Sequence, residues 1–171
     1  PIMMCGAGIA VAFKASVFNI GGGGQFLIGA FVGIYGAIKW EFLPGPLRWI
    51  VPLIAAALSG ALWAFLPGIL KAFRNVNIII STIMMNYLAR YMVNSLIKAT
   101  IFFSAKSETQ PIPAEAMLPR LGLDKLFPGS QVNGGIVIAA ILAVLVYILL
   151  SKTTFGYQLK ACGSNRFAAR Y

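Results

Sequence analysis

The chain has 171 residues, of which 59% are hydrophobic and only 11% are charged, and its mean hydropathy is +0.83. A soluble domain carries about 25% charged residues, so a water-soluble globular fold is excluded by the apolar surface it would expose. The formal charge of +10 comes from cations that stand singly between apolar blocks, a pattern typical of membrane-flanking charge and not of a nucleic-acid-binding surface.

Few residues are suited to metal binding or to catalysis. The sequence has no His, and its two cysteines, Cys5 and Cys162, lie far apart. It therefore has no zinc-type spacing, and a structural disulfide is not expected. We predict no metal site and no catalytic residue. We also expect a fragment that lacks spans at both ends, because the sequence starts inside an apolar run and stops after a basic segment.

Five apolar blocks meet or approach the length of about 20 residues that a membrane-crossing helix requires. The sequence therefore predicts an all-α, polytopic transmembrane helix bundle that forms a single domain over residues 1–171. The predicted spans are residues 1–18, 24–38, 47–66, 78–103 and 135–150. The connections are residues 39–46 and 67–77, a long loop at 104–133 with a short interfacial helix at 114–118, and the segment 151–171.

Lysine and arginine in short loops predict which side of the membrane is cytoplasmic. One side carries Lys14, Lys71, Arg74, Lys152, Lys160, Arg166 and Arg170. The other carries Lys39, Arg48 and Lys98, with Lys106, Arg120 and Lys125 in the long loop. We predict that the first side is cytoplasmic and that residues 104–133 are extracytoplasmic.

Four consecutive glycines, residues 21–24, follow the first span. Each weakens a helix by about 1 kcal/mol relative to Ala, and in hydrocarbon the freed backbone groups need partners. We predict a discontinuous helix that resumes at Gly24, with its first amides facing the break. Asn19, Gly22 and Gln25 are candidate substrate-pathway residues. The alternative is close helix packing through small residues. A phosphate-binding loop is rejected because Gln25 follows the glycines instead of Lys with Ser or Thr.

Polar residues interrupt the fourth predicted span. Asn77 is a suitable N-cap, and Thr82 and Asn86, four residues apart, share a helix face that Arg90 extends. Polar side chains at this depth usually face the bundle interior, and a charge there costs at least about 2.5–3.5 kcal/mol. Thr82, Asn86 and Arg90 are therefore candidate pathway residues, with interhelical hydrogen bonding as the alternative for the two uncharged ones.

Hydrophobicity falls after the last span, where residues 151–171 mix small residues with cations and aromatics. Phe167 and Tyr171 can form one helical face. A short amphipathic helix there could lie on the membrane or dock into a groove on a partner.

These three stretches, in this order, resemble the permease subunits of ABC importers, in the group of branched-chain amino acid, ribose and nucleoside permeases. The nucleoside and simple-sugar branch is the most similar. The matching residues are Phe18–Gly22 with Gly24 and Gln25, then Ile80–Tyr87, then Thr154, Gly156, Leu159, Lys160, Ala161, Gly163, Asn165, Ala168, Ala169 and Tyr171. Two acids usual in that branch are absent, because Gly23 and Ile78 stand in their places.

The resemblance implies a multi-pass permease subunit in a bacterial plasma membrane, with a purine nucleoside as solute. Simple-sugar and riboflavin-type permeases are alternatives, and an ion-coupled secondary transporter is one from another class. The implied partners are an ABC ATPase subunit, a second permease subunit as homo- or heterodimer, an extracytoplasmic solute-binding protein and membrane lipid, with no nucleic acid. ATP and magnesium would bind the ATPase, so this chain would be no enzyme and bind no cofactor. The implied ATPase-coupling residues are Gly156, Tyr157, Lys160, Asn165 and Ala168.

Overall fold

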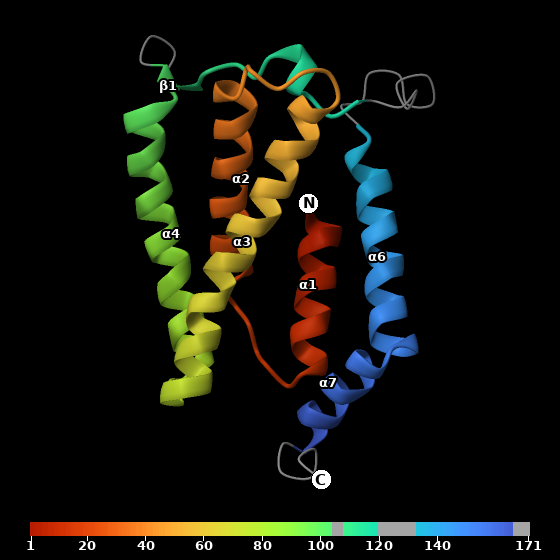
Figure 1. Ribbon diagram of the computed structural model, residues 1–171. Coiled ribbons are helices and arrows are strands. Elements are labelled where there is room, and N and C mark those ends of the chain that lie inside the picture. The colour runs from red at the N-terminus through yellow and green to blue at the C-terminus, as the bar shows by residue number, and fades with distance from the viewer. Residues whose placement is uncertain (104–107, 120–132, 166–171) are drawn as a thin grey trace. The chain divides into compact units, whose positions relative to one another are not determined.

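The computed structural model describes residues 1–103, 108–119 and 133–165, which are mostly helical (Figure 1). Contacts within the chain divide it into two compact units. Unit 1 consists of Pro1–Asn19 with Leu118–Tyr171, and unit 2 is the continuous segment Ile20–Met117. Each unit has its own packing.

Unit 1 contains α1 (Ile2–Lys14), α6 (Gly135–Lys152) and α7 (Thr154–Ser164). Helices α1 and α6 lie side by side, and α7 turns away at the end of α6 (Figure 1). Thr153 fixes that turn as the N-cap of α7, because its hydroxyl accepts a hydrogen bond of 3.1 Å from Gly156 N. Gly156 is buried against the last turn of α6, where a Cβ would collide with the Leu149 carbonyl oxygen.

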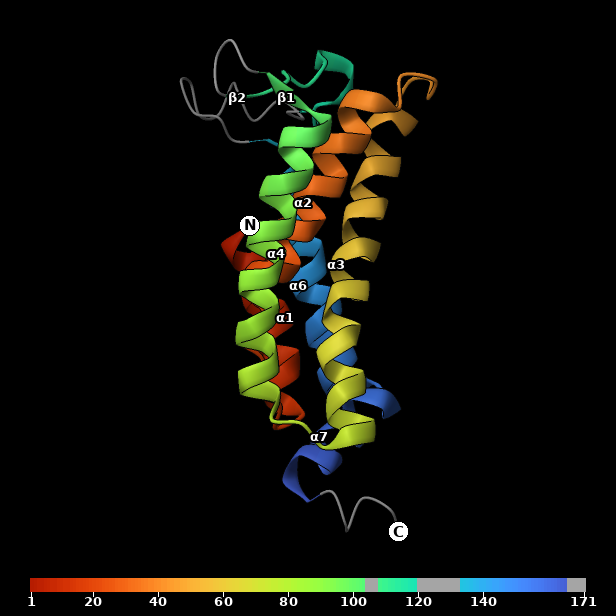
Figure 2. The same ribbon diagram turned by 90° about the vertical axis from the view of Figure 1, so that its left-hand side faces the viewer.

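Unit 2 is built on three long helices, α2 (Gly22–Lys39), α3 (Leu47–Arg74) and α4 (Ile78–Thr100). Successive helices run in opposite directions, and α2 lies between α3 and α4 (Figure 2). The short segments β1 (Phe102–Phe103) and β2 (Glu108–Thr109) and the 3-10 helix η1 (Ala114–Ala116) follow. The N-cap predicted at Asn77 is confirmed, since its side chain accepts a 3.0 Å hydrogen bond from Ile79 N.

Helices α2 and α3 approach each other through small residues. A Cβ at Gly29 would lie 2.9 Å from the Ala56 carbonyl oxygen, and one at Gly60 would lie 3.1 Å from that of Gln25. A Cβ at Gly33 would lie 3.2 Å from the Ala56 Cβ. Helices in membranes associate through such close backbone contact, because lipid supplies no hydrophobic drive between them.

We expect Gly29→Ala to lower the stability of unit 2 by about 1–3 kcal/mol, because the backbone of α3 must move to accept the new Cβ. Gly68→Ala is the matched control, since a Cβ at Gly68 meets nothing within 4 Å. Thermal unfolding of the full-length protein in detergent measures the difference. Equal midpoints for the two variants would contradict the close contact.

The predicted end of the third span at residue 66, and the connection predicted at 67–77, are wrong. Helix α3 continues through the buried Pro67 to Arg74. One proline removes a single backbone donor and costs about 3 kcal/mol, whereas ending the helix there would free several backbone groups in an apolar run. At about 42 Å, α3 is longer than the hydrocarbon core of about 30 Å, which lets Lys71 and Arg74 reach an interface.

Other boundaries also differ from the predictions. Helix α1 ends at Lys14 and not at residue 18, because Ser16 adopts a left-handed φ of 53°. Helix α4 ends at Thr100 and not at residue 103, because β1 pairs antiparallel with β2. The ladder has only two residues in each strand, and the described residues are otherwise mostly helical, in agreement with the all-α prediction. The predicted interfacial helix at 114–118 is the shorter η1.

Among the described helices, α3 and α6 are long and apolar enough to cross a membrane, by length and composition alone. Helix α1 is apolar but shorter. These two helices overlap the predicted spans 47–66 and 135–150, and all five crossings stay predictions.

Candidate functional site

The side chain of Asn86 joins α4 to the start of α2. Its Oδ1 accepts a hydrogen bond of 2.7 Å from Gly24 N, and its Nδ2 donates one of 2.9 Å to the Ile20 carbonyl oxygen. The first amides of a helix have no partner within that helix. Asn86 therefore satisfies one such donor and one carbonyl of the non-helical segment before α2.

Gly24 is the closest point of approach between α2 and α4. A Cβ there would lie 2.8 Å from Asn86 Oδ1, 3.1 Å from Asn86 Cα and 3.2 Å from Ala89 Cβ. At the neighbouring Gly23, a Cβ would meet only Asn86 Oδ1, at an ordinary distance of 3.9 Å. The two adjacent glycines thus differ sharply, and only Gly24 is required by the packing.

The glycine tract lies partly inside a helix. Helix α2 begins at Gly22 with Gly21 as its N-cap, so the predicted start at Gly24 is wrong. The non-helical segment is residues 15–21. Glycines are tolerated in the first turn because the amides there do not contribute intrahelical hydrogen bonds, and Asn86 supplies the partner that Gly24 lacks.

Thr82 and Asn86 face the inside of unit 2, as predicted. Thr82 is 1% exposed, and its hydroxyl donates to its own helix, 2.8 Å from the Ile78 carbonyl oxygen. The same face continues through Ala89 and Val93, which form a buried cluster with Ile28. The hydroxyl of Thr82 and the amide of Asn86 are therefore engaged in holding the fold.

Arg90 departs from that face. It is exposed, and it has no hydrogen-bond or ion-pair partner among the described residues. Residues four apart on a helix differ in direction around its axis by about 40°. Arg90 is therefore turned further from α2 than Asn86, which lies four residues before it. The prediction that Arg90 extends the inward face is wrong for unit 2, and the exposed Tyr87 and Tyr91 flank it instead.

The other predicted pathway residues lie around the start of α2. Asn19 precedes it, and Gly22 and Gln25 are half-buried in its first turns. Within the described part of the chain, the Gln25 amide group has no hydrogen-bond partner.

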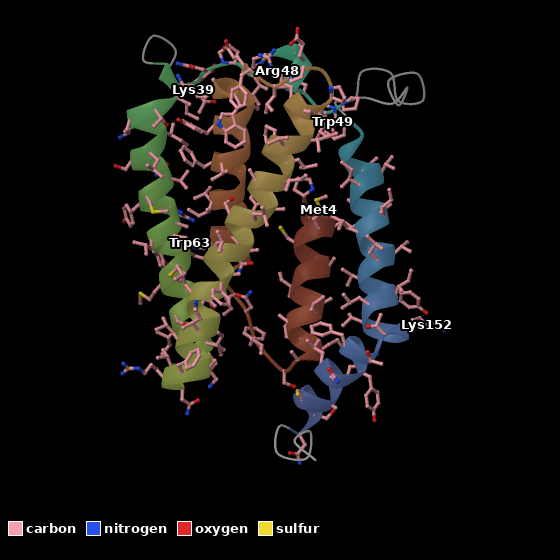
Figure 3. The ribbon with its side chains drawn as sticks, in the orientation of Figure 1. Met4, Lys39, Arg48, Trp49, Trp63 and Lys152 are labelled. Carbon is pink, nitrogen blue, oxygen red and sulfur yellow. The ribbon has the colours of Figure 1, made fainter. Side chains whose placement is uncertain are left out.

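Sequence reasoning missed Trp63. Its ring packs against the Ile28, Ala89 and Val93 cluster, and its indole Nε1 is buried without a partner in the described ranges (Figure 3). A tryptophan in the middle of an apolar span was the available signal.

The opposite end of unit 2 gathers charged and aromatic side chains. Lys39, Arg48 and Trp49 lie there (Figure 3), and Arg48 forms an ion pair with Glu115 of η1. Lys71 and Arg74 lie at the other end of α3. Within unit 2, this distribution follows the predicted assignment of Lys39 and Arg48 to one side and Lys71 and Arg74 to the other.

The predicted coupling residues lie on and just after α7. Gly156 is buried at its start, Tyr157 is 75% exposed, and Lys160 is half-buried. The exposed Phe155 adds a second aromatic ring next to Tyr157 in sequence. Asn165 ends the helix. Ala168, and the predicted helical face of Phe167 and Tyr171, lie outside the described residues.

A family described as "Branched-chain amino acid transport system / permease component" matches residues 1–171, which is the whole chain. The chain belongs to this family. The chain is 35% identical over 171 residues to the guanosine ABC transporter permease protein NupP of Bacillus subtilis, covering all of this chain and 49% of NupP. It is 32% identical over 176 residues to the nucleoside ABC transporter permease protein NupB of Lactococcus lactis, covering 100% of this chain and 48% of NupB.

The glucose ABC transporter permease protein TsgB13 of Haloferax volcanii is 30% identical over 179 residues, covering 99% of this chain and 46% of TsgB13. The chain thus spans about half the length of the curated relatives it matches. No solved structure matches it.

Proposed function

We propose that the chain is part of the membrane-spanning permease subunit of an ATP-driven importer, and that its solute is a purine nucleoside. The observation that carries this proposal is the match, over the whole of this chain, to permeases named for guanosine and nucleosides. The structure supports it with an apolar helical unit in which a glycine-rich helix start is held by the polar Asn86.

The proposed pathway residues are Asn19, Gly22, Gln25, Thr82, Asn86 and Arg90. Gln25, Arg90 and the indole of Trp63 have polar groups that the described fold does not use. Gln25 and Arg90 would contact the solute directly. The indole of Trp63 is buried, and Thr82 and Asn86 lie on the packed face of α4. A guanidinium only donates hydrogen bonds. Arg90 therefore suits the carbonyl oxygen and ring nitrogen of a purine base, which arginine contacts together.

The proposed assembly has three further protein components. Helix α7, through Gly156, Tyr157, Lys160, Asn165 and Ala168, would dock on an ABC ATPase subunit that binds ATP and magnesium. A second permease subunit would complete the pathway, and an extracytoplasmic solute-binding protein would deliver the solute. The chain would be a multi-pass protein of a bacterial plasma membrane. ATP hydrolysis would take place in the ATPase subunit. This chain would supply a pathway that switches between an outward-facing and an inward-facing state.

A simple sugar is the second candidate solute, because one relative is named for glucose. The two solutes demand different groups. A sugar presents hydroxyls that both donate and accept, whereas Arg90 only donates. The donor-only guanidinium of Arg90 therefore favours the nucleoside.

The test is uptake by the full-length permease, reconstituted in proteoliposomes with its ATPase and binding protein. We expect guanosine uptake that requires ATP inside the vesicle. Unlabelled inosine, whose base has the same carbonyl oxygen and ring nitrogen, should compete with it, and glucose and riboflavin should leave it unchanged. Competition by glucose alone would replace the nucleoside with a sugar. Uptake that follows an ion gradient and persists without ATP would identify a secondary transporter and overturn the proposal.

A further inference from the structure

Helix α1 ends in a hydrogen-bonded turn that normally contains glycine. Val17 N donates to the Ala12 carbonyl oxygen over 3.0 Å, and Ser16 N donates to that of Phe13, also over 3.0 Å. These two bonds define a Schellman C-terminal motif, whose left-handed residue is usually Gly. Ser occupies that position with φ of 53°. A side chain in this conformation costs about 1 kcal/mol. A contact made by the Ser16 hydroxyl offsets that cost.

The Ser16 hydroxyl binds α7. Its Oγ donates a 2.6 Å hydrogen bond to the Gly163 carbonyl oxygen, near the end of α7. Gly163 itself allows this approach, because a Cβ there would collide with the Lys14 carbonyl oxygen and lie 3.1 Å from the Ala15 carbonyl carbon. The last turn of α7 is thus seated directly on the turn that ends α1.

The chain that leaves this contact packs back on α1. The ring of Phe18 packs edge-on against that of Phe13, with centroids 5.2 Å apart. The hydrogen-bonded turn, the bond from Ser16 to Gly163 and this ring pair together fix the end of α1 and the last turn of α7 within unit 1.

We infer that Ser16 and Gly163 are positioning residues that couple α7 to the end of α1. A displacement of α7 is then passed directly to α1 through this contact. This inference rests on the proposed docking of α7 on the ATPase. It assigns the transmission of that contact to Ser16 and Gly163, and not only to the link between α6 and α7.

Ser16→Gly separates a coupling role from a capping role. Glycine suits the left-handed turn better than serine, so the thermal stability of the protein should stay the same or rise. The hydrogen bond to Gly163 is lost, however. In the reconstituted transporter, we expect guanosine uptake per ATP hydrolysed to fall about fivefold, the equivalent of one net hydrogen bond.

Gly163→Ala tests the other side of the contact. The added Cβ pushes α7 away from the end of α1, so we expect uptake per ATP to fall about tenfold or more. Gly8→Ala on α1 is the matched control, because a Cβ at Gly8 meets nothing within 4 Å. Co-purification of the ATPase with each variant shows whether the assembly is intact.

Coupling in Ser16→Gly equal to that of the unmodified transporter would overturn the inference and leave the proposed importer standing. Failure of the unmodified protein to bind an ATPase or to transport with ATP would instead overturn the proposed function. Because Ser16→Gly is not expected to destabilise the protein, a folding defect in Gly163→Ala does not remove the test.

Discussion

Replacing Gly24 with Ala should destabilise unit 2 by about 1–3 kcal/mol, the usual result of forcing extra volume into a packed contact. The added Cβ would lie 2.8 Å from Asn86 Oδ1 and 3.2 Å from Ala89 Cβ. In a helix free of such contacts, the same change would stabilise by about 1 kcal/mol. The clash opposes that gain and exceeds it, because it also disrupts the hydrogen bond from Gly24 N to Asn86.

The adjacent Gly23 provides the control. Its Cβ would meet only Asn86 Oδ1 at 3.9 Å, so Gly23→Ala should keep or raise the unfolding midpoint. Thermal unfolding of the two full-length variants in detergent makes the comparison, with guanosine uptake as a second measurement. Similar midpoints for Gly23→Ala and Gly24→Ala would contradict the close approach of α4 to α2.

Replacing Asn86 with Leu, which is similar in size, should have the largest effect of any single change on α4. It leaves both Gly24 N and the Ile20 carbonyl oxygen without the partner they now have. Interhelical hydrogen bonds in membranes average about 0.6 kcal/mol, because the unfolded helices find other partners. Here the orphaned donor, Gly24 N, belongs to a partly buried helix start, where an unsatisfied group costs about 1–3 kcal/mol, whereas the Ile20 carbonyl is exposed and adds less.

Asn94→Leu is the control for that change. Asn94 lies on the same helix and is exposed, and it has no hydrogen-bond partner within the described residues. We expect its unfolding midpoint to stay close to that of the unmodified protein, while Asn86→Leu unfolds at a clearly lower temperature. An equally small shift for both would mean that Asn86 is not the residue that holds the start of α2.

Local sequence signals located most of the helices. Apolar length predicted helices close to α2, α4 and α6, and the amide of Asn77 predicted where α4 begins. These features depend on residues near one another in the chain. The predicted end at residue 66 failed because a proline is a weak stop signal when the residues after it are apolar and the helix can continue to Arg74.

The composition and order of the sequence by themselves determined a membrane-associated helical protein with a glycine tract and polar residues inside one span. Only the tertiary structure decided which of these residues meet. Asn86 pairs with Gly24 across 62 positions, and Ser16 with Gly163 across 147. Helical periodicity assigns a residue to a face but does not say which helix packs on that face. It therefore left open that Asn86 holds the start of α2 and that Arg90 points elsewhere.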